Sequence, residues 1–154
     1  MTDSIAFGAD GQANHALTVL RRQDAGGDLT QNVSFVPGVM LNADPELGLS
    51  GTWRSAESRV LEFGASIQGL GNWLGLHISV PLQDTRGHGI AGFAARIQAQ
   101  DIFVARASLR SGTEGGFVDC FFDKHMLFTP DEATHVDALQ LHQRDTIPAT
   151  APWR

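Results

Sequence analysis

Runs in which apolar and polar residues alternate dominate the chain, and they predict β-strands. The clearest run extends from Trp73 to Pro81, where Leu74, Leu76, Ile78 and Val80 alternate with Trp73, Gly75, His77 and Ser79. A period of two places the four aliphatic side chains on one face of a strand and the other four on the opposite face. The run from Val60 to Ile67 follows the same rule and predicts a second strand.

Other runs of the same kind predict further strands, at His15–Leu20, Val33–Val36, Ile102–Leu109, Gly116–Phe122 and Lys124–Phe128. Residues that favour turns lie between the runs, as in Pro37-Gly38 and Asp84-Thr85-Arg86-Gly87. Short strands at regular intervals between turns are typical of a β-sandwich.

Two segments fit more than one structure. Ile90–Gln100 alternates like a strand, although its apolar residues also fit one face of a helix. We favour the strand because the neighbouring segments are strands. Thr129–Gln143 begins with Thr-Pro-Asp-Glu, which is typical of a helix start, and then alternates. We expect one short helical turn there, followed by a final strand.

Length and composition set the scale of the fold. The 154 residues, 42% of them hydrophobic, fit one globular domain with a core of its own. The sequence therefore predicts a single all-β domain over residues 1–154. We expect an antiparallel, jelly-roll-like β-sandwich of about eight strands, with at most one short helical turn.

Net charge and cysteine content argue against several classes of ligand and site. The net charge of −6 disfavours nucleic acid, because acidic surfaces repel phosphates. The single cysteine, Cys120, excludes an intramolecular disulfide and a cysteine-based zinc site. We find no apolar run of the ~18 residues that span a membrane, and no signal peptide at the start. We expect a soluble protein, cytoplasmic by default, without membrane insertion.

Motifs that would name a reaction are weak. Gly87–Gly92 matches G-x-G-x-x-G, but no strand directly precedes it and no acid follows at about 20 residues, so we interpret it as a turn. The six histidines lack the spacings of common metal sites. A metal site stays open as an alternative to surface polar residues for one set, Asp119, Asp123, His135 and Asp137. We assign no catalytic residue, metal ligand or cofactor.

The polar face of the Trp73 strand carries the most suggestive pattern. Trp73 and His77 point the same way, and Gly75 between them leaves backbone uncovered. A flat aromatic side chain on a sheet can stack on the apolar face of a sugar ring. Arg96 and Gln98 on a neighbouring strand would supply donors and acceptors for hydroxyls. The alternative is that a loop, or the tail that carries Trp153, covers Trp73.

A family resemblance rests on Leu109–Phe122 together with the Trp73 strand and His135-Val136-Asp137. Over residues 50 to 142 the chain resembles the jelly-roll sandwiches of carbohydrate-binding modules and glycan-enzyme accessory domains. The resemblance implies that Arg110 and Asp119 lie near a sheet end. Similar sandwiches also build the surface proteins of phages and other particles.

These observations lead to three hypotheses. The first is non-catalytic binding of a glycan or polysaccharide, with Trp73, His77, Arg96 and Gln98 as the ligand-binding residues. The second is a structural or decoration subunit that self-associates, or joins a larger assembly, through a sheet face or edge. The third is an enzyme, which we favour less because it would need a cleft of convergent acids or histidines.

Overall fold

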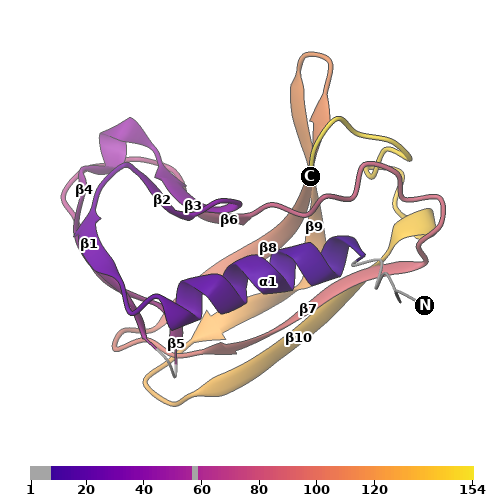
Figure 1. The fold of residues 1–154 in the computed structure, drawn as a ribbon. Helices are drawn as coiled ribbons and strands as arrows, with labels where there is room; N and C mark the ends of the chain where they lie inside the picture. The colour runs from indigo at the N-terminus through magenta and orange to yellow at the C-terminus, as the bar shows by residue number, and fades with distance from the viewer. Residues whose placement is uncertain (1–7, 57–58) are drawn as a thin grey trace. The chain divides into compact units, whose positions relative to one another are not determined.

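A computed structural model of the protein describes residues 8–56 and 59–154. Over these residues the chain forms ten strands, one α-helix, α1 (Ala9–Arg22), and two short 3-10 helices, η1 (Pro45–Leu47) and η2 (Leu141–Gln143) (Figure 1). The strands are β1 (Gly26–Leu29), β2 (Asn32–Val36), β3 (Val39–Ala43), β4 (Leu49–Ala56), β5 (Arg59–Ile67), β6 (Leu74–Ile78), β7 (Ile90–Ile97), β8 (Phe103–Thr113), β9 (Gly116–Phe128) and β10 (Ala133–Gln140). All strand pairs are antiparallel, so the predicted all-β class is confirmed.

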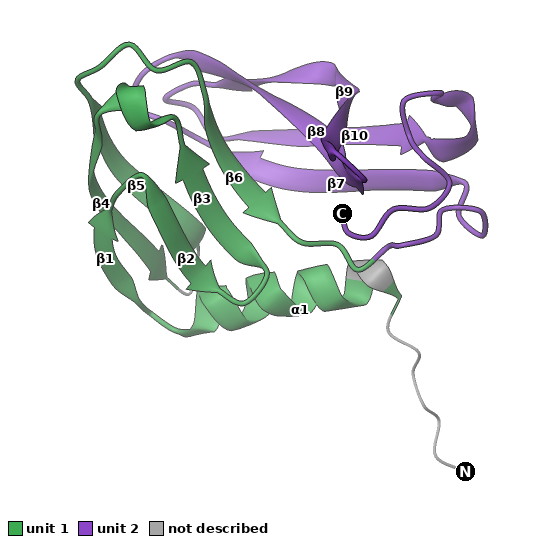
Figure 2. Ribbon diagram, turned by 90° about the horizontal axis from the view of Figure 1, so that it is seen from above, with its two compact units in different colours: residues 1–81 green, residues 82–154 purple. Residues whose placement is uncertain are grey.

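The chain divides into two compact units, residues 1–81 (unit 1) and 82–154 (unit 2), which Figure 2 colours separately. Each unit has a hydrophobic cluster of its own. A single domain over residues 1–154 and a jelly-roll order of strands stay predictions.

Unit 1 contains two three-stranded sheets, in the orders β1-β4-β5 and β2-β3-β6, and α1 contacts β2, β4 and β5. Its buried cluster combines one residue of α1 with residues of β1, β2 and β3: Leu20, Leu29, Phe35, Val36, Val39 and Leu41. The ring of Phe35 meets Trp53 edge-to-face at 4.8 Å, a geometry that aromatic pairs prefer. The core of unit 1 therefore lies between the helix and both sheets.

The strand predicted at His15–Leu20 is wrong, because these residues belong to α1. Ala13, Leu17 and Leu20 are spaced so that a helix places them on one face, and Leu20 is fully buried. A short apolar run satisfies a period of two and a period of 3.6 almost equally well. The helix also exceeds the single short helical turn that we expected.

Unit 2 contains two two-stranded sheets, β10-β7 and β8-β9. Its buried cluster joins β9 and β10 to the segment that follows them: Cys120, Phe122, Leu139, Leu141 and Ile147. The strand favoured at Ile90–Gln100 is confirmed as β7. The Gly87–Gly92 motif therefore leads into a strand rather than a helix.

The helical turn expected at Thr129 does not form. The Thr129 hydroxyl donates to the carbonyl of Asp131, and the carbonyl of Pro130 accepts from the Gln98 side chain at 2.6 Å. These contacts hold the segment as a tight turn between β9 and β10. In the described part of the chain, no helix is long and apolar enough to cross a membrane.

Candidate functional site

The predicted site residues Trp73 and His77 lie in unit 1. Trp73 directly precedes β6, its carbonyl accepts from the Asp44 N–H at 3.0 Å, and its side chain is 50% exposed. His77 stands opposite Met40 in the pairing of β3 with β6. Its ring lies over Gly75, since a Cβ at Gly75 would meet His77 Nε2 at 2.9 Å. The expected glycine gap is therefore filled by the imidazole.

The other two predicted residues, Arg96 and Gln98, lie in unit 2. The Arg96 guanidinium is 3.5 Å from the Glu132 carboxylate, and both side chains are more than half exposed. The Gln98 amide donates to Pro130 and thereby supports the turn before β10. Because the two pairs belong to different units, the four-residue site stays a prediction.

A second surface lies on the hairpin of β8 and β9 and combines charged and aromatic side chains within one unit. In its register Ser108 pairs with Phe121, Arg110 with Asp119 and Gly112 with Phe117. Alternate residues share one side of the hairpin. We call this surface the arginine–aromatic face, and it comprises Arg106, Ser108, Arg110, Phe117, Asp119, Phe121 and the Trp153 ring.

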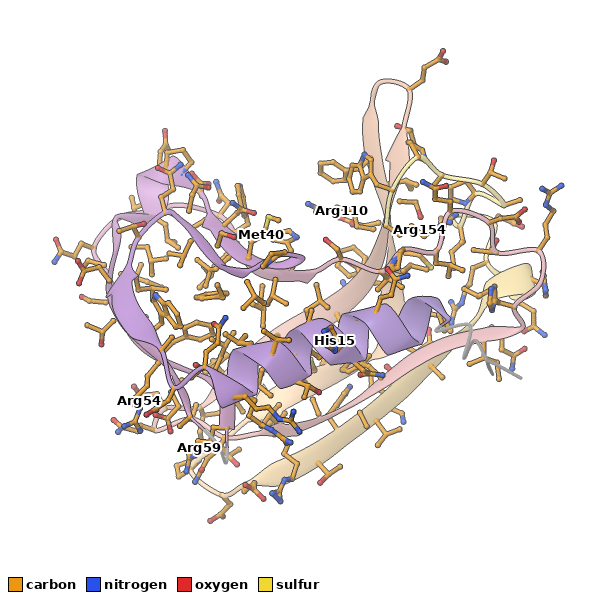
Figure 3. The ribbon with its side chains drawn as sticks, viewed as in Figure 1. His15, Met40, Arg54, Arg59, Arg110 and Arg154 are labelled. Atoms are coloured by element: carbon orange, nitrogen blue, oxygen red, sulfur yellow. The ribbon has the colours of Figure 1, made fainter. Side chains whose placement is uncertain are left out.

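An ion pair lies at the centre of the arginine–aromatic face. Arg110 Nε and Nη2 donate to the two carboxylate oxygens of Asp119 at 2.8 and 2.7 Å, and Figure 3 shows Arg110 on β8. Hydrogen bonding to Asp119 raises the pKa of Arg110. This fork-to-carboxylate geometry fixes both planar groups. Only 18% of the Asp119 side chain is exposed, so the pair is partly shielded from water.

Aromatic rings flank the ion pair. The Arg110 guanidinium carbon lies 3.7 Å from the centre of the Phe117 ring. The guanidinium carbon of Arg106 lies 4.2 Å from the centre of the Phe121 ring. Stacking of this kind holds a guanidinium flat while its edge stays accessible. Phe117 is nevertheless 54% exposed, so part of its ring surface remains open.

Trp153 belongs to the same surface because its indole lies over Gly112, which has no side chain. A Cβ at Gly112 would lie 2.5 Å from Trp153 Nε1, so the indole occupies the space that any other residue would fill. The Gly112 N–H also donates to the Trp153 carbonyl at 3.0 Å. The indole is 47% exposed. It therefore forms a flat platform beside Phe117, the register partner of Gly112.

An irregularity in β9 keeps Phe121 outside. Between the pairs Arg106–His125 and Ser108–Phe121, β9 contains two more residues than β8. Phe121 is exposed, whereas Phe122 is buried against Phe93 with its ring centre at 5.0 Å. Asp137 supports the irregular segment, because its carboxylate accepts from the Lys124 N–H at 2.8 Å. Burial alone raises the pKa of Asp137, but this bond and the one from the Ala138 N–H, together with nearby positive charge, lower the pKa overall.

The four residues left open as a metal site do not gather. Asp119 binds Arg110, Asp123 pairs with Arg144, and Asp137 accepts backbone N–H groups. The ring of His135 instead lies tilted against that of Phe93, with 5.5 Å between the ring centres. Among the residues that the structure describes, no three His, Cys, Asp or Glu side chains are arranged to hold a metal ion.

The arginine–aromatic face was not predicted as a site from the sequence, although the resemblance implied Arg110 and Asp119 near a sheet end. The signal that could have found it is the hairpin turn. Glu114-Gly115 joins the paired residues Thr113 and Gly116, and two-residue turns of this kind fix the register of both strands. No family model, curated protein or solved structure matches the chain.

Proposed function

We propose that the protein binds carbohydrate without catalysis, and that the arginine–aromatic face of unit 2 is its binding surface. The observation that carries the proposal is the fixed Arg110–Asp119 pair beside the exposed rings of Phe117 and Trp153. The function is the one predicted from the sequence, but the proposed binding surface is not the predicted one, which was the face of the Trp73 strand.

The chemistry of the face matches that of a sugar. A sugar ring has an apolar C–H face, which stacks on aromatic rings, and a rim of hydroxyls, which donate and accept hydrogen bonds. Trp153 and Phe117 supply the flat apolar area. The remaining N–H groups of Arg110 donate to hydroxyls, and the Asp119 oxygens accept from them. Because the pair is already fixed, little side-chain freedom is lost on binding.

A glycan array followed by calorimetry on the best ligand tests this proposal. Trp153→Ala and Phe117→Ala should each weaken binding about tenfold, which corresponds to ~1.4 kcal/mol, because each removes a stacking surface. Trp73→Ala should leave the affinity unchanged. The site predicted from the sequence requires the reverse result, so the pair of variants decides between the two faces. Absence of binding to any glycan would contradict the proposal.

The assembly hypothesis has an observation of its own, on β6. In the described part of unit 1, β6 pairs only with β3 and is therefore an edge strand. Its side chains Leu74, Leu76 and Ile78 stand opposite the buried Ala43, Leu41 and Val39, yet they are 45%, 47% and 38% exposed. No residue of β6 is charged, although charges usually protect exposed edges.

We therefore propose, as a second candidate, self-association of the chain through β6. An antiparallel pair centred on Leu76 would set Leu74 against Ile78 of a second copy and continue the apolar face. Sedimentation should then give a dimer for the wild type and a monomer for Leu76→Lys. Leu70→Lys is the matched control, because Leu70 is exposed but lies outside β6. A wild-type monomer at high concentration would contradict this candidate.

A further inference from the structure

The groups that surround its guanidinium distinguish Arg106 from the other arginines of unit 2. Four of them pair with carboxylates: Arg86 with Asp84, Arg96 with Glu132, Arg110 with Asp119 and Arg144 with Asp123. A fifth, Arg154, is buried and donates to a hydroxyl and two carbonyls. Among the described residues, no carboxylate lies within ion-pair distance of Arg106, and its side chain is exposed.

The Arg106 guanidinium is held in a defined orientation. Its guanidinium lies against the Phe121 ring, and its register partner across the hairpin is His125, which is also exposed. Stacking of this kind fixes the plane of the guanidinium. The ring shields one face of the guanidinium from water, and the N–H edge remains free to donate. A planar fork held in this way suits a carboxylate, which it binds through two parallel hydrogen bonds.

The charge of the face agrees with this assignment. Two guanidinium groups and one carboxylate leave an excess positive charge on a surface of a chain whose net charge is −6. Such a local excess attracts an anion that the rest of the surface repels. Arg106 and Arg110 are four residues apart on β8, about 13 Å in an extended strand. A ligand that contacts both Arg106 and Trp153 is therefore longer than one sugar ring.

We propose that the ligand of the arginine–aromatic face is an acidic oligosaccharide, and that Arg106 binds the carboxylate of a uronic acid unit. This inference rests on the proposed function and adds the class of sugar to it. Phe121 acts as a positioning residue for Arg106, while Arg110, Asp119, Phe117 and Trp153 contact the neighbouring rings.

Matched pairs of ligands test the inference on the full chain. Oligomers of galacturonate, glucuronate and mannuronate are each compared by calorimetry with the same oligomer after methyl esterification, which removes the charge and keeps the rings. For at least one pair, the wild type should bind the acid at least tenfold more tightly than its ester. This preference should shrink as salt is added, because exposed charges are screened.

Arg106→Gln should reduce the preference to near one while the ester still binds as before. Arg59→Gln, which removes an exposed arginine of unit 1, should leave the preference intact. Equal binding of acid and ester by the wild type, in every pair that binds, would overturn the inference and leave the proposed function standing. A preference that survives in Arg106→Gln would also overturn it. Failure of every acid, ester and arrayed neutral glycan to bind would overturn both proposals.

Discussion

Arg154 is a buried cation whose partners are uncharged. Its Nε donates to the Ser111 hydroxyl at 2.9 Å, and its other nitrogens donate to the carbonyls of Leu82 and Pro148. Burial lowers the pKa of Arg154. The residue holds the end of unit 2 next to β8 and so keeps the neighbouring Trp153 on Gly112.

We expect Arg154→Met to loosen this arrangement. Methionine preserves the apolar stem but leaves a buried hydroxyl and two carbonyls without their donor, at a cost of about 2 kcal/mol or more. Urea denaturation should show a lower midpoint, and affinity for the glycan should fall because the Trp153 platform moves. Arg21→Met, at an exposed position of α1, serves as the control. Equal midpoints for both variants would show that the buried bonds contribute nothing.

Asp84 gives the clearest pH dependence. Hydrogen bonds from the Arg86 side chain and backbone N–H lower the pKa of Asp84 from 3.8 to about 2. Because the folded pKa is the lower one, the stabilisation is complete above the unfolded pKa of 3.8 and is lost as pH falls toward 2. Asp84→Asn should therefore be less stable than the wild type at pH 7, and most of the difference should be lost between pH 4 and pH 2. Denaturation midpoints across this range measure the difference, and one that is undiminished at pH 2 argues against the Arg86 contacts as its source.

At the scale of elements, β4 and β5 depend on one glycine and tolerate change at another. Gly51 in β4 has a φ of +141°, and a Cβ there would lie 1.9 Å from the carbonyl oxygen of Gly64. A Cβ at Gly64 in β5 would meet only Thr52 atoms, the nearest at 3.6 Å. The paired strands can therefore approach closely only because residue 51 has no side chain.

Gly51→Ala should accordingly destabilise the protein by about 2 kcal/mol or more, since both the backbone conformation and the close approach oppose a side chain. Gly64→Ala should change the midpoint little. Thermal denaturation of the two variants, compared with the wild type, measures the difference. Similar losses for both would mean that the strands adjust to a Cβ at residue 51.

The elements also show which sequence signals were sufficient. Alternation alone located β5 and β6, because each has a period of two over at least five residues, whereas β7 was assigned as a strand only because its neighbours are strands. Alternation failed at α1, where packing against β2, β4 and β5 decides between two periods that the short run satisfies equally. It passed over β3, and also over β1 and β4, in which glycines and polar residues leave no clear alternation. The predicted Trp73 site combined polar residues of two strands on the assumption that the strands are neighbours. The sequence pattern assigns residues to a face of one strand, but it does not show which strands lie side by side.

The candidate site was harder to predict than the fold for a physical reason. The Arg110–Asp119 pair follows from a local turn, and the resemblance had already implied these two residues. Trp153 reaches Gly112 from 41 positions further along the chain, and no periodicity reports such a contact. The lack of a carboxylate beside Arg106 among the described residues is recognised only once the folded structure shows the partners of the other arginines of unit 2. Long-range contacts and the absence of a charge partner both require the folded structure.

At the scale of the whole molecule, each unit has its own hydrophobic cluster, so the units could unfold together or separately. The units have 81 and 73 residues, a size at which a core alone rarely supplies more than about 3–5 kcal/mol. We therefore expect neither unit to unfold alone, as a single domain requires. In a Trp153→Phe background, the fluorescence of Trp53 and Trp73 reports on unit 1, and labelling of the buried Cys120 reports on unit 2. The two urea midpoints should coincide, and two separate midpoints would define two domains.

The two additional residues in β9 also bear on how this chain can vary in length during evolution. Since the irregularity is even, odd-numbered residues from Phe117 to Leu127 point outward on both sides of it. Losing or gaining one residue there would turn half of the hairpin inside out, exchanging Phe121 for Phe122. Losing or gaining a pair would only alter the curvature. In diverged relatives, insertions and deletions between Phe121 and His125 should therefore come in twos.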